Sequence, residues 1–206
     1  FKLIMSDADG GRPRTIFQSS EPILSPSWSP DGSRVTYMSF RGKRSGIYVQ
    51  TLASGEVQKV TSFSGLNSAP AFSPDGRKLV MTLSKDGNPE LYVANLRTGQ
   101  IDRMTNHFGI DTEASWSPDG NSILFTSSRG GKPQLYMLTV VDKTVKRVTF
   151  DGDYNSNGAF TPDGKNIFFT RCPRPKNKKK KEKYNLGCEI FYSKYLGDTE
   201  LNLSDS

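Results

Sequence analysis

A 44-residue repeat is the feature that most constrains how this chain can fold. The tripeptide Pro-Asp-Gly occurs four times, each time after Ser or Thr, and its proline stands at positions 30, 74, 118 and 162. Each interval is therefore 44 residues. A register kept through three successive intervals is typical of a chain that uses one structural unit repeatedly. The sequence predicts a repeat protein.

Each repeat has the pattern of four short strands. In the second repeat, Ala69–Ser73 is a short apolar stretch that ends at the turn residues Pro74-Asp75-Gly76. Lys78–Ser84 is nearly continuously apolar, which indicates a strand buried on both faces. Glu90–Leu96 follows as a third strand, and residues 100–105 alternate as an outer strand would. Four antiparallel strands per unit of this length are typical of a β-propeller blade, so we predict an all-β propeller.

The repeats divide the chain into about four and a half predicted blades. Residues 1–18 match the third and fourth strands of a unit and form an outer half-blade, with Asp9-Gly10 as its turn. Because Phe1 begins within a strand-like run, the chain reads as a mature or excised piece. The full units are expected at 19–62, 63–106, 107–150 and 151–206, and the last one carries a basic insertion at 172–188.

Residues that recur once per blade are expected to build the blade rather than to catalyse a reaction. The only histidine, His107, has neither metal-ligand spacing around it nor a nucleophile motif such as G-x-S-x-G. We therefore expect no enzyme activity, no metal and no cofactor. The residues read as structural are the aromatics Trp28, Phe72, Trp116 and Phe160 and the turn carboxylates Asp31, Asp75, Asp119 and Asp163.

The positive charge of the chain is concentrated in the insertion. The chain has a net charge of +7. The segment between Cys172 and Cys188 contributes +6 of it, because it holds seven basic residues and one acidic residue. This local basicity argues against a uniform nucleic-acid-binding surface. No apolar run approaches the ~18 residues of a membrane span.

The insertion leaves two interpretations open for the state of its cysteines and two for the role of its lysines. Cys172 ends one predicted strand and Cys188 begins its antiparallel neighbour, a geometry that suits a disulfide, although two free thiols are the alternative. The lysines are either a solvated loop that protects a sheet edge or a site for an anionic partner. The candidate anion-binding residues are Lys178, Lys179, Lys180 and Lys181.

The predicted meander also indicates which end of the blades binds a partner. The turns after strands one and three lie at one end, and the crossovers between blades lie at the other. The crossovers 19–26, 62–70, 106–114 and 150–159 differ from one another while the Pro-Asp-Gly turns stay constant. Variable loops on a constant scaffold are typical of a binding face.

The segments "SDADG", "LSPSWSPDG", "NSAPAFSPDG", "LYVANLRTGQI" and "DTEASWSPDG" occur in this order, and over residues 1–170 the chain resembles the C-terminal propeller of the TolB family. The resemblance implies a non-enzymatic periplasmic adaptor of the Tol-Pal envelope system, which serves outer-membrane integrity and cell division. Its implied partners are the peptidoglycan-associated lipoprotein Pal, other Tol components and colicin-type peptides. TolB propellers have six blades behind an α/β domain, and this chain shows neither that domain nor two of the blades; its pattern breaks at residue 171.

Carrying the family's Pal-binding positions over gives seven candidate contact residues on two crossovers. They are Leu66, Asn67, Ser68 and Ala69, and then Asp111, Thr112 and Glu113. For Thr112 and Glu113 the alternative is a purely structural role at the start of a strand. Because the S-P-D-G motif also marks the propellers of prolyl-oligopeptidase-like serine peptidases, the alternative function is a regulatory propeller that gates such an enzyme.

Overall fold

The computed structural model describes residues 1–41, 44–172 and 188–194, and every regular element in them is a β-strand. The strands form antiparallel sheets in simple sequence order. The predicted fold class, an all-β protein made of four-stranded propeller blades, is confirmed. The chain divides into two compact units, Phe1–Arg103 and Met104–Ser206.

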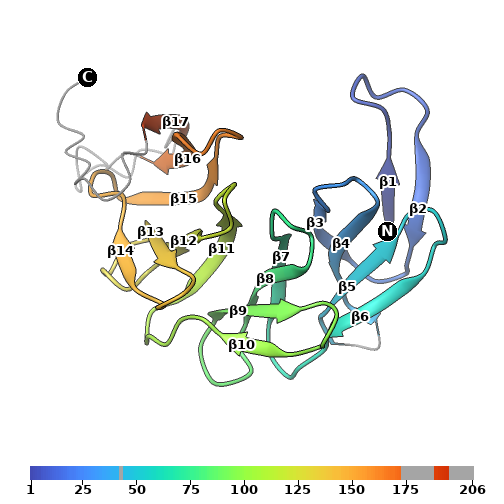
Figure 1. Ribbon diagram of the computed structural model, residues 1–206, viewed down its shortest axis with the longest axis horizontal. Coiled ribbons are helices and arrows are strands. Elements are labelled where there is room, and N and C mark those ends of the chain that lie inside the picture. Colours follow the sequence, from blue (N-terminus) through green and yellow to red (C-terminus); the bar gives the residue numbers. More distant parts are fainter. Residues whose placement is uncertain (42–43, 173–187, 195–206) are drawn as a thin grey trace, which may run out of the picture. The chain divides into compact units, whose positions relative to one another are not determined.

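The first unit contains a two-stranded half-blade and two four-stranded sheets (Figure 1). The half-blade consists of β1 (Lys2–Met5) and β2 (Arg14–Gln18). The first sheet contains β3 (Ile23–Trp28), β4 (Arg34–Ser39), β5 (Gly46–Thr51) and β6 (Val57–Thr61). The second contains β7 (Asn67–Phe72), β8 (Lys78–Leu83), β9 (Glu90–Asn95) and β10 (Ile101–Arg103).

The second unit contains one four-stranded and one three-stranded sheet. The first is built from β11 (Asp111–Trp116), β12 (Ser122–Ser127), β13 (Gln134–Thr139) and β14 (Val145–Arg147). The second is built from β15 (Tyr154–Phe160), β16 (Asn166–Cys172) and β17 (Glu189–Lys194). The fourth strand that the four-strand pattern predicts for the unit 151–206 lies outside the described residues.

A Ser-Pro-Asp-Gly motif, or Thr-Pro-Asp-Gly in the last case, closes the turn between the first two strands of each of the four sheets that follow the half-blade. Ser29 donates its hydroxyl hydrogen to Asp31 Oδ1 (2.6 Å), and the backbone N–H of Ser33 donates to the same oxygen (3.1 Å). The hydrogen bond from Ser29, followed by those from Ser33, lowers the pKa of Asp31 to about 2. The same network recurs at Asp75, Asp119 and Asp163.

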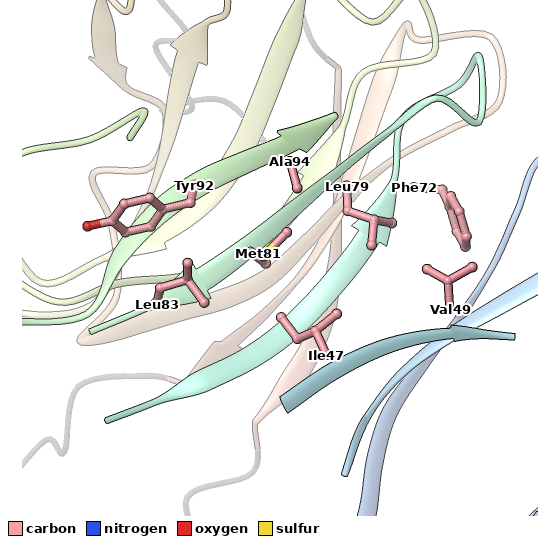
Figure 2. Close-up of a cluster of buried hydrophobic side chains, with 8 residues drawn as sticks. All are labelled: Ile47, Val49, Phe72, Leu79, Met81, Leu83, Tyr92 and Ala94. Atoms are coloured by element: carbon pink, nitrogen blue, oxygen red, sulfur yellow. The ribbon is translucent and has the colours of Figure 1, made fainter. Parts of the chain in front are cut away.

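The core lies between successive sheets. Figure 2 shows Ile47 and Val49 of β5 facing Phe72 of β7 and the buried side chains of β8 and β9. In the second unit β15 packs closely on the preceding sheet, since a Cβ added at Gly158 of β15 would lie 2.6 Å from Leu124 of β12. Within the first unit β7 therefore packs against the sheet of β3–β6, and within the second unit β15 packs against the sheet of β11–β14.

Each inner strand contains a β-bulge, and β7 begins two residues before the predicted start at Ala69. Asn67 and Ser68 pair with Leu83 and Thr82, and the register then shifts by one residue before Ala71. The bulge residue has a left-handed backbone, which is uncommon outside glycine. It recurs at intervals of 44 residues as Ser25 (φ 52°), Ala69 (φ 49°), Glu113 (φ 54°) and Asn157 (φ 52°).

Candidate functional site

The crossovers between sheets and the loops between second and third strands meet at one end of each unit. The backbone N–H of Leu66 donates to Ser84 Oγ (2.8 Å), and the N–H of Ser84 donates to the Leu66 carbonyl (3.1 Å). Ile110 and Ser128, each 44 residues further on, make the same two hydrogen bonds (2.8 and 3.0 Å). The residue before each of these inner strands thus has its backbone held from both sides.

Asn67, one of the candidate contact residues, is fully buried and shapes the second crossover. Its Oδ1 accepts a hydrogen bond from the N–H of Phe63 (3.1 Å), and its Nδ2 donates to the carbonyl oxygens of Phe63 (2.9 Å) and Gly65 (3.3 Å). Its backbone N–H donates to Ser45 Oγ of the preceding sheet (3.1 Å). The side chain is therefore occupied within the fold, where it shapes the loop of residues 63–66.

The neighbours of Asn67 are more accessible. Leu66 exposes its side chain, whereas Ser68 and Ala69 are half-buried. Ala69 is the bulge residue of β7, so its left-handed backbone turns the strand at this point. These three residues are placed at the crossover end, where the sequence predicts contacts.

Asp111, at the position equivalent to Asn67, is also fully buried. Its Oδ2 accepts a hydrogen bond from Arg129 Nη2 (2.7 Å), which makes a largely buried ion pair between the start of β11 and the loop after β12. The guanidinium of Arg129 also lies 5.3 Å from the ring centre of Phe125 and 5.0 Å from that of Tyr136. Like Asn67, Asp111 supports a loop instead of facing solvent.

Thr112 and Glu113 are half-buried beside Asp111. Glu113 Oε2 accepts hydrogen bonds from Thr126 Oγ1 (2.8 Å) and from the backbone N–H of Asn157 (3.2 Å). Glu113 thus joins β11, β12 and β15, which fits the structural alternative for this residue. A role in contacting a partner stays a prediction for both Thr112 and Glu113.

Leu66 was expected as a contact residue from the sequence, but the other exposed apolar residues of the crossovers were not. Ile110 and Tyr154 stand where Leu66 stands in the second repeat, and Phe108 and Phe150 lie in the loops just before them. The sequence signal that could have identified them is the presence of large hydrophobic residues in otherwise polar loops. Aligning the repeats at their inner strands would have shown the shared position.

Cys172 and Cys188 are joined by a disulfide, with their Cα atoms 4.2 Å apart. The pair extends the ladder of β16 and β17, in which Arg171 lies opposite Glu189. Cys172 occupies the position that Ser84 and Ser128 hold in the earlier repeats, and its carbonyl accepts a hydrogen bond from Asp153 (3.2 Å). The candidate anion-binding residues Lys178, Lys179, Lys180 and Lys181 lie outside the described residues.

The described residues offer no arrangement for metal chemistry. Among them there is no cluster of three or more His, Cys, Asp or Glu side chains that could hold an ion. His107 accepts a hydrogen bond from the N–H of Gly109 at Nδ1 (2.9 Å), and its ring lies beside Phe108 (4.2 Å between ring centres). In the described part of the chain we also find no helix of the length and apolarity that a membrane crossing requires.

Residues 1–199 match a family model that is described as the TolB beta propeller domain. The Tol-Pal system protein TolB of Alkalilimnicola ehrlichii is 54% identical over 68 residues, which are 33% of this chain and 16% of that protein. The Tol-Pal system protein TolB of a Marinomonas species is 56% identical over 69 residues, again 16% of its length. The matched segment is therefore a small part of each relative.

Among solved structures, the similarity to TolB extends over more of the chain than in the sequence comparisons. TolB from Acinetobacter baumannii is similar with a TM-score of 0.82 and 43% identity, covering 94% of this chain and 48% of that one. A puromycin hydrolase is similar with a TM-score of 0.67 but only 10% identity, covering 81% of this chain and 28% of the enzyme. The chain thus spans less than half of the TolB structure that it resembles.

Proposed function

The chain belongs to the TolB β-propeller family, and from this membership we propose that it acts as a non-enzymatic adaptor in the periplasm. It binds the peptidoglycan-associated lipoprotein Pal through the crossover end of its blades and thereby serves outer-membrane integrity and cell division. The observation that carries the proposal is the 43% identity to a solved TolB over 94% of the chain. The relatives that match its repeats at 52–56% identity are named Tol-Pal system proteins.

The geometry of the crossovers supports this choice of face. The residues proposed to contact the partner directly are Leu66, Ser68, Ala69 and Thr112, because each has some exposed surface at the crossover end. Asn67 and Asp111 are proposed to act indirectly, since both are buried and hold the crossovers in shape. Glu113 is proposed to do both, because its half-buried carboxylate also joins two sheets.

A peptidase-gating propeller is the weaker alternative. The likeness to a puromycin hydrolase covers 28% of that enzyme at 10% identity, and at that level it supports a shared fold alone. The identity to TolB proteins is several times higher over the same repeats. We therefore propose the adaptor role and treat gating as the outcome to exclude.

Calorimetric titration of this chain with the purified soluble domain of Pal tests the proposal. Binding with a Kd of about 1 μM or tighter is expected. The titration is repeated at low and high salt, because a strong loss at high salt would assign part of the affinity to the basic insertion. Absence of binding, from a chain that circular dichroism shows to be folded, would refute the Pal assignment.

A further inference from the structure

The crossover end of the second unit exposes four large apolar side chains, which we call the apolar platform. They are Phe108 (88% exposed), Ile110 (51%), Phe150 (59%) and Tyr154 (40%). Among the described residues, the opposite end of the same unit exposes one such side chain, Val141 (91%). The unit's remaining exposed apolar residues, Phe168, Ile190 and Tyr192, lie within strands. The asymmetry between the two ends marks the crossover end as the apolar one.

Polar contacts hold the loops beneath the apolar platform together. Ile110 is held by Ser128 through the two backbone hydrogen bonds described above. Lys132, in the same loop as Ser128, forms an ion pair with Asp153 (2.6 Å), and the N–H of Asn155 donates to the carbonyl of Pro133 (2.9 Å). Loops 104–110, 128–133 and 148–153 are therefore joined in one assembly.

A held backbone matters for binding, because side chains on ordered loops lose less entropy when they are covered by a partner. Exposed aromatic and branched apolar residues on such a scaffold have the composition and the rigidity of interface anchors. Ile110 is held to Ser128 by its backbone, so the clamp leaves its side chain exposed. The apolar platform thus has the properties of a preorganised contact surface.

A positive charge stands at the border of this surface. Arg147 of β14 is exposed, its guanidinium lies 5.0 Å from the ring centre of Phe150, and its Nε donates to the carbonyl of Thr149 (2.6 Å). Within the part of the chain that the structure describes, Arg147 has no carboxylate partner. A guanidinium with free donors next to an apolar surface is suited to a carboxylate of a partner.

We propose that the apolar platform and Arg147 bind a segment of a protein partner that presents apolar side chains next to a carboxylate. The inference rests on the proposed function for the choice of face and adds the chemistry of the partner segment. A protein segment is favoured over an anionic lipid surface because the segment can place its single carboxylate at Arg147 and away from the exposed carboxylate of Asp151. A lipid surface spreads negative charge over the whole platform, so it would also face Asp151 and would gain little from Lys132, which is paired with Asp153.

The test uses a random-peptide library displayed on phage and selected on the immobilised full chain. Enriched peptides are then measured by fluorescence anisotropy against the wild type and against Phe108→Ser, Ile110→Ser and Val141→Ser. We expect peptides rich in apolar and acidic residues, and affinities at least about tenfold lower for the two platform variants. Val141→Ser is the matched control, because it removes a side chain at the opposite end that is about as exposed as that of Phe108, and it should leave the affinity unchanged.

The role of Arg147 is tested by coupling two changes. Replacing the acidic residue of an enriched peptide by its amide should weaken binding to the wild type but not to Arg147→Gln. Failure to enrich any peptide, or enriched peptides that bind all variants equally, would overturn the inference. So would retention on phosphatidylglycerol vesicles that is lost in Phe108→Ser, because the partner would then be a lipid surface.

These outcomes are separable from the fate of the proposed function. If Pal binds the wild type while the enriched peptides bind the platform variants as tightly as the wild type, the adaptor role stands and the platform inference fails. If peptides depend on the platform while Pal does not bind, the platform stands and the Pal assignment fails.

Discussion

Ser128 and Ile110 form a two-way backbone clamp: the Ser128 hydroxyl oxygen accepts the Ile110 N–H at 2.8 Å, and the Ser128 N–H donates to the Ile110 carbonyl at 3.0 Å. Ser84 and Leu66 repeat the same pair of contacts one blade earlier. The clamp ties a variable loop to a constant part of the blade. Its repetition explains how loops of different sequence keep a common shape at this end.

Removing the hydroxyl of Ser128 should loosen the crossover without unfolding the blade. Ser128→Ala leaves the N–H of Ile110 without its acceptor, so we expect a loss of about 1 kcal/mol in the free energy of unfolding. Hydrogen exchange at residues 106–110 should become faster, measured by mass spectrometry alongside urea unfolding. The exposed Ser64→Ala is the control. Unchanged exchange at 106–110 would show that the clamp does not hold the loop.

The turn carboxylates should make the fold sensitive to acid. The pKa of Asp31 is lowered to about 2, first by the hydrogen bond from Ser29, and those of Asp75, Asp119 and Asp163 are lowered by the equivalent bonds. Because these folded-state pKa values lie below that of an unfolded aspartate, the stabilisation is complete above pH 4 and is lost as the pH falls toward 2.

We therefore expect the unfolding free energy, followed by circular dichroism in urea, to drop between pH 4 and pH 2. Asp31→Asn should be less stable than the wild type at pH 7 and should approach it at pH 2. Glu21→Gln, which changes an exposed carboxylate outside the motif, serves as the control. A constant difference between Asp31→Asn and the wild type across this range would contradict the assignment.

Close packing between β15 and the preceding sheet leaves no room for a side chain at residue 158. A Cβ there would lie 2.6 Å from Leu124 Cδ2 and 3.0 Å from Leu135 Cδ1. Gly158→Val should therefore destabilise the protein by about 1–3 kcal/mol through overpacking. Ala159→Val, on the exposed side of the same strand, should have little effect in the same chemical denaturation. Equal effects of the two substitutions would mean that the sheets separate easily.

The disulfide between Cys172 and Cys188 closes a sequence separation of 16 residues. In the chain-entropy account, a loop of this size contributes about 3 kcal/mol by restricting the unfolded state. The double variant Cys172→Ser, Cys188→Ser should unfold at lower urea concentration than the wild type. Added reductant should bring the wild type to the level of the variant and leave the variant unchanged. A wild type that resists full reduction without loss of stability would contradict this.

The strands could be predicted from the sequence because their apolar pattern reports burial directly. Lys78–Ser84 was expected as a buried strand and β8 covers Lys78–Leu83. The start of β7 could not be predicted, since Ala69 gives no sign that its backbone is left-handed. Polar residues of the crossovers were equally ambiguous: Asn67 and Asp111 look like surface residues in sequence, and only the fold shows that they point inward to hold the loops.

Asn67 and Leu66 therefore provide the sharpest separation between shaping a loop and touching a partner. Asn67→Ala leaves the N–H and carbonyl of Phe63 without their side-chain partner, so we expect a loss of about 1–3 kcal/mol in stability. Leu66→Ser removes an exposed side chain whose backbone hydrogen bonds remain, so stability should stay at the wild-type value. Urea unfolding measures the first effect, and titration with the Pal domain measures the second, where Leu66→Ser should weaken binding. If Asn67→Ala is as stable as the wild type and loses binding instead, its side chain must leave the buried site to meet the partner, and the loop-shaping role fails.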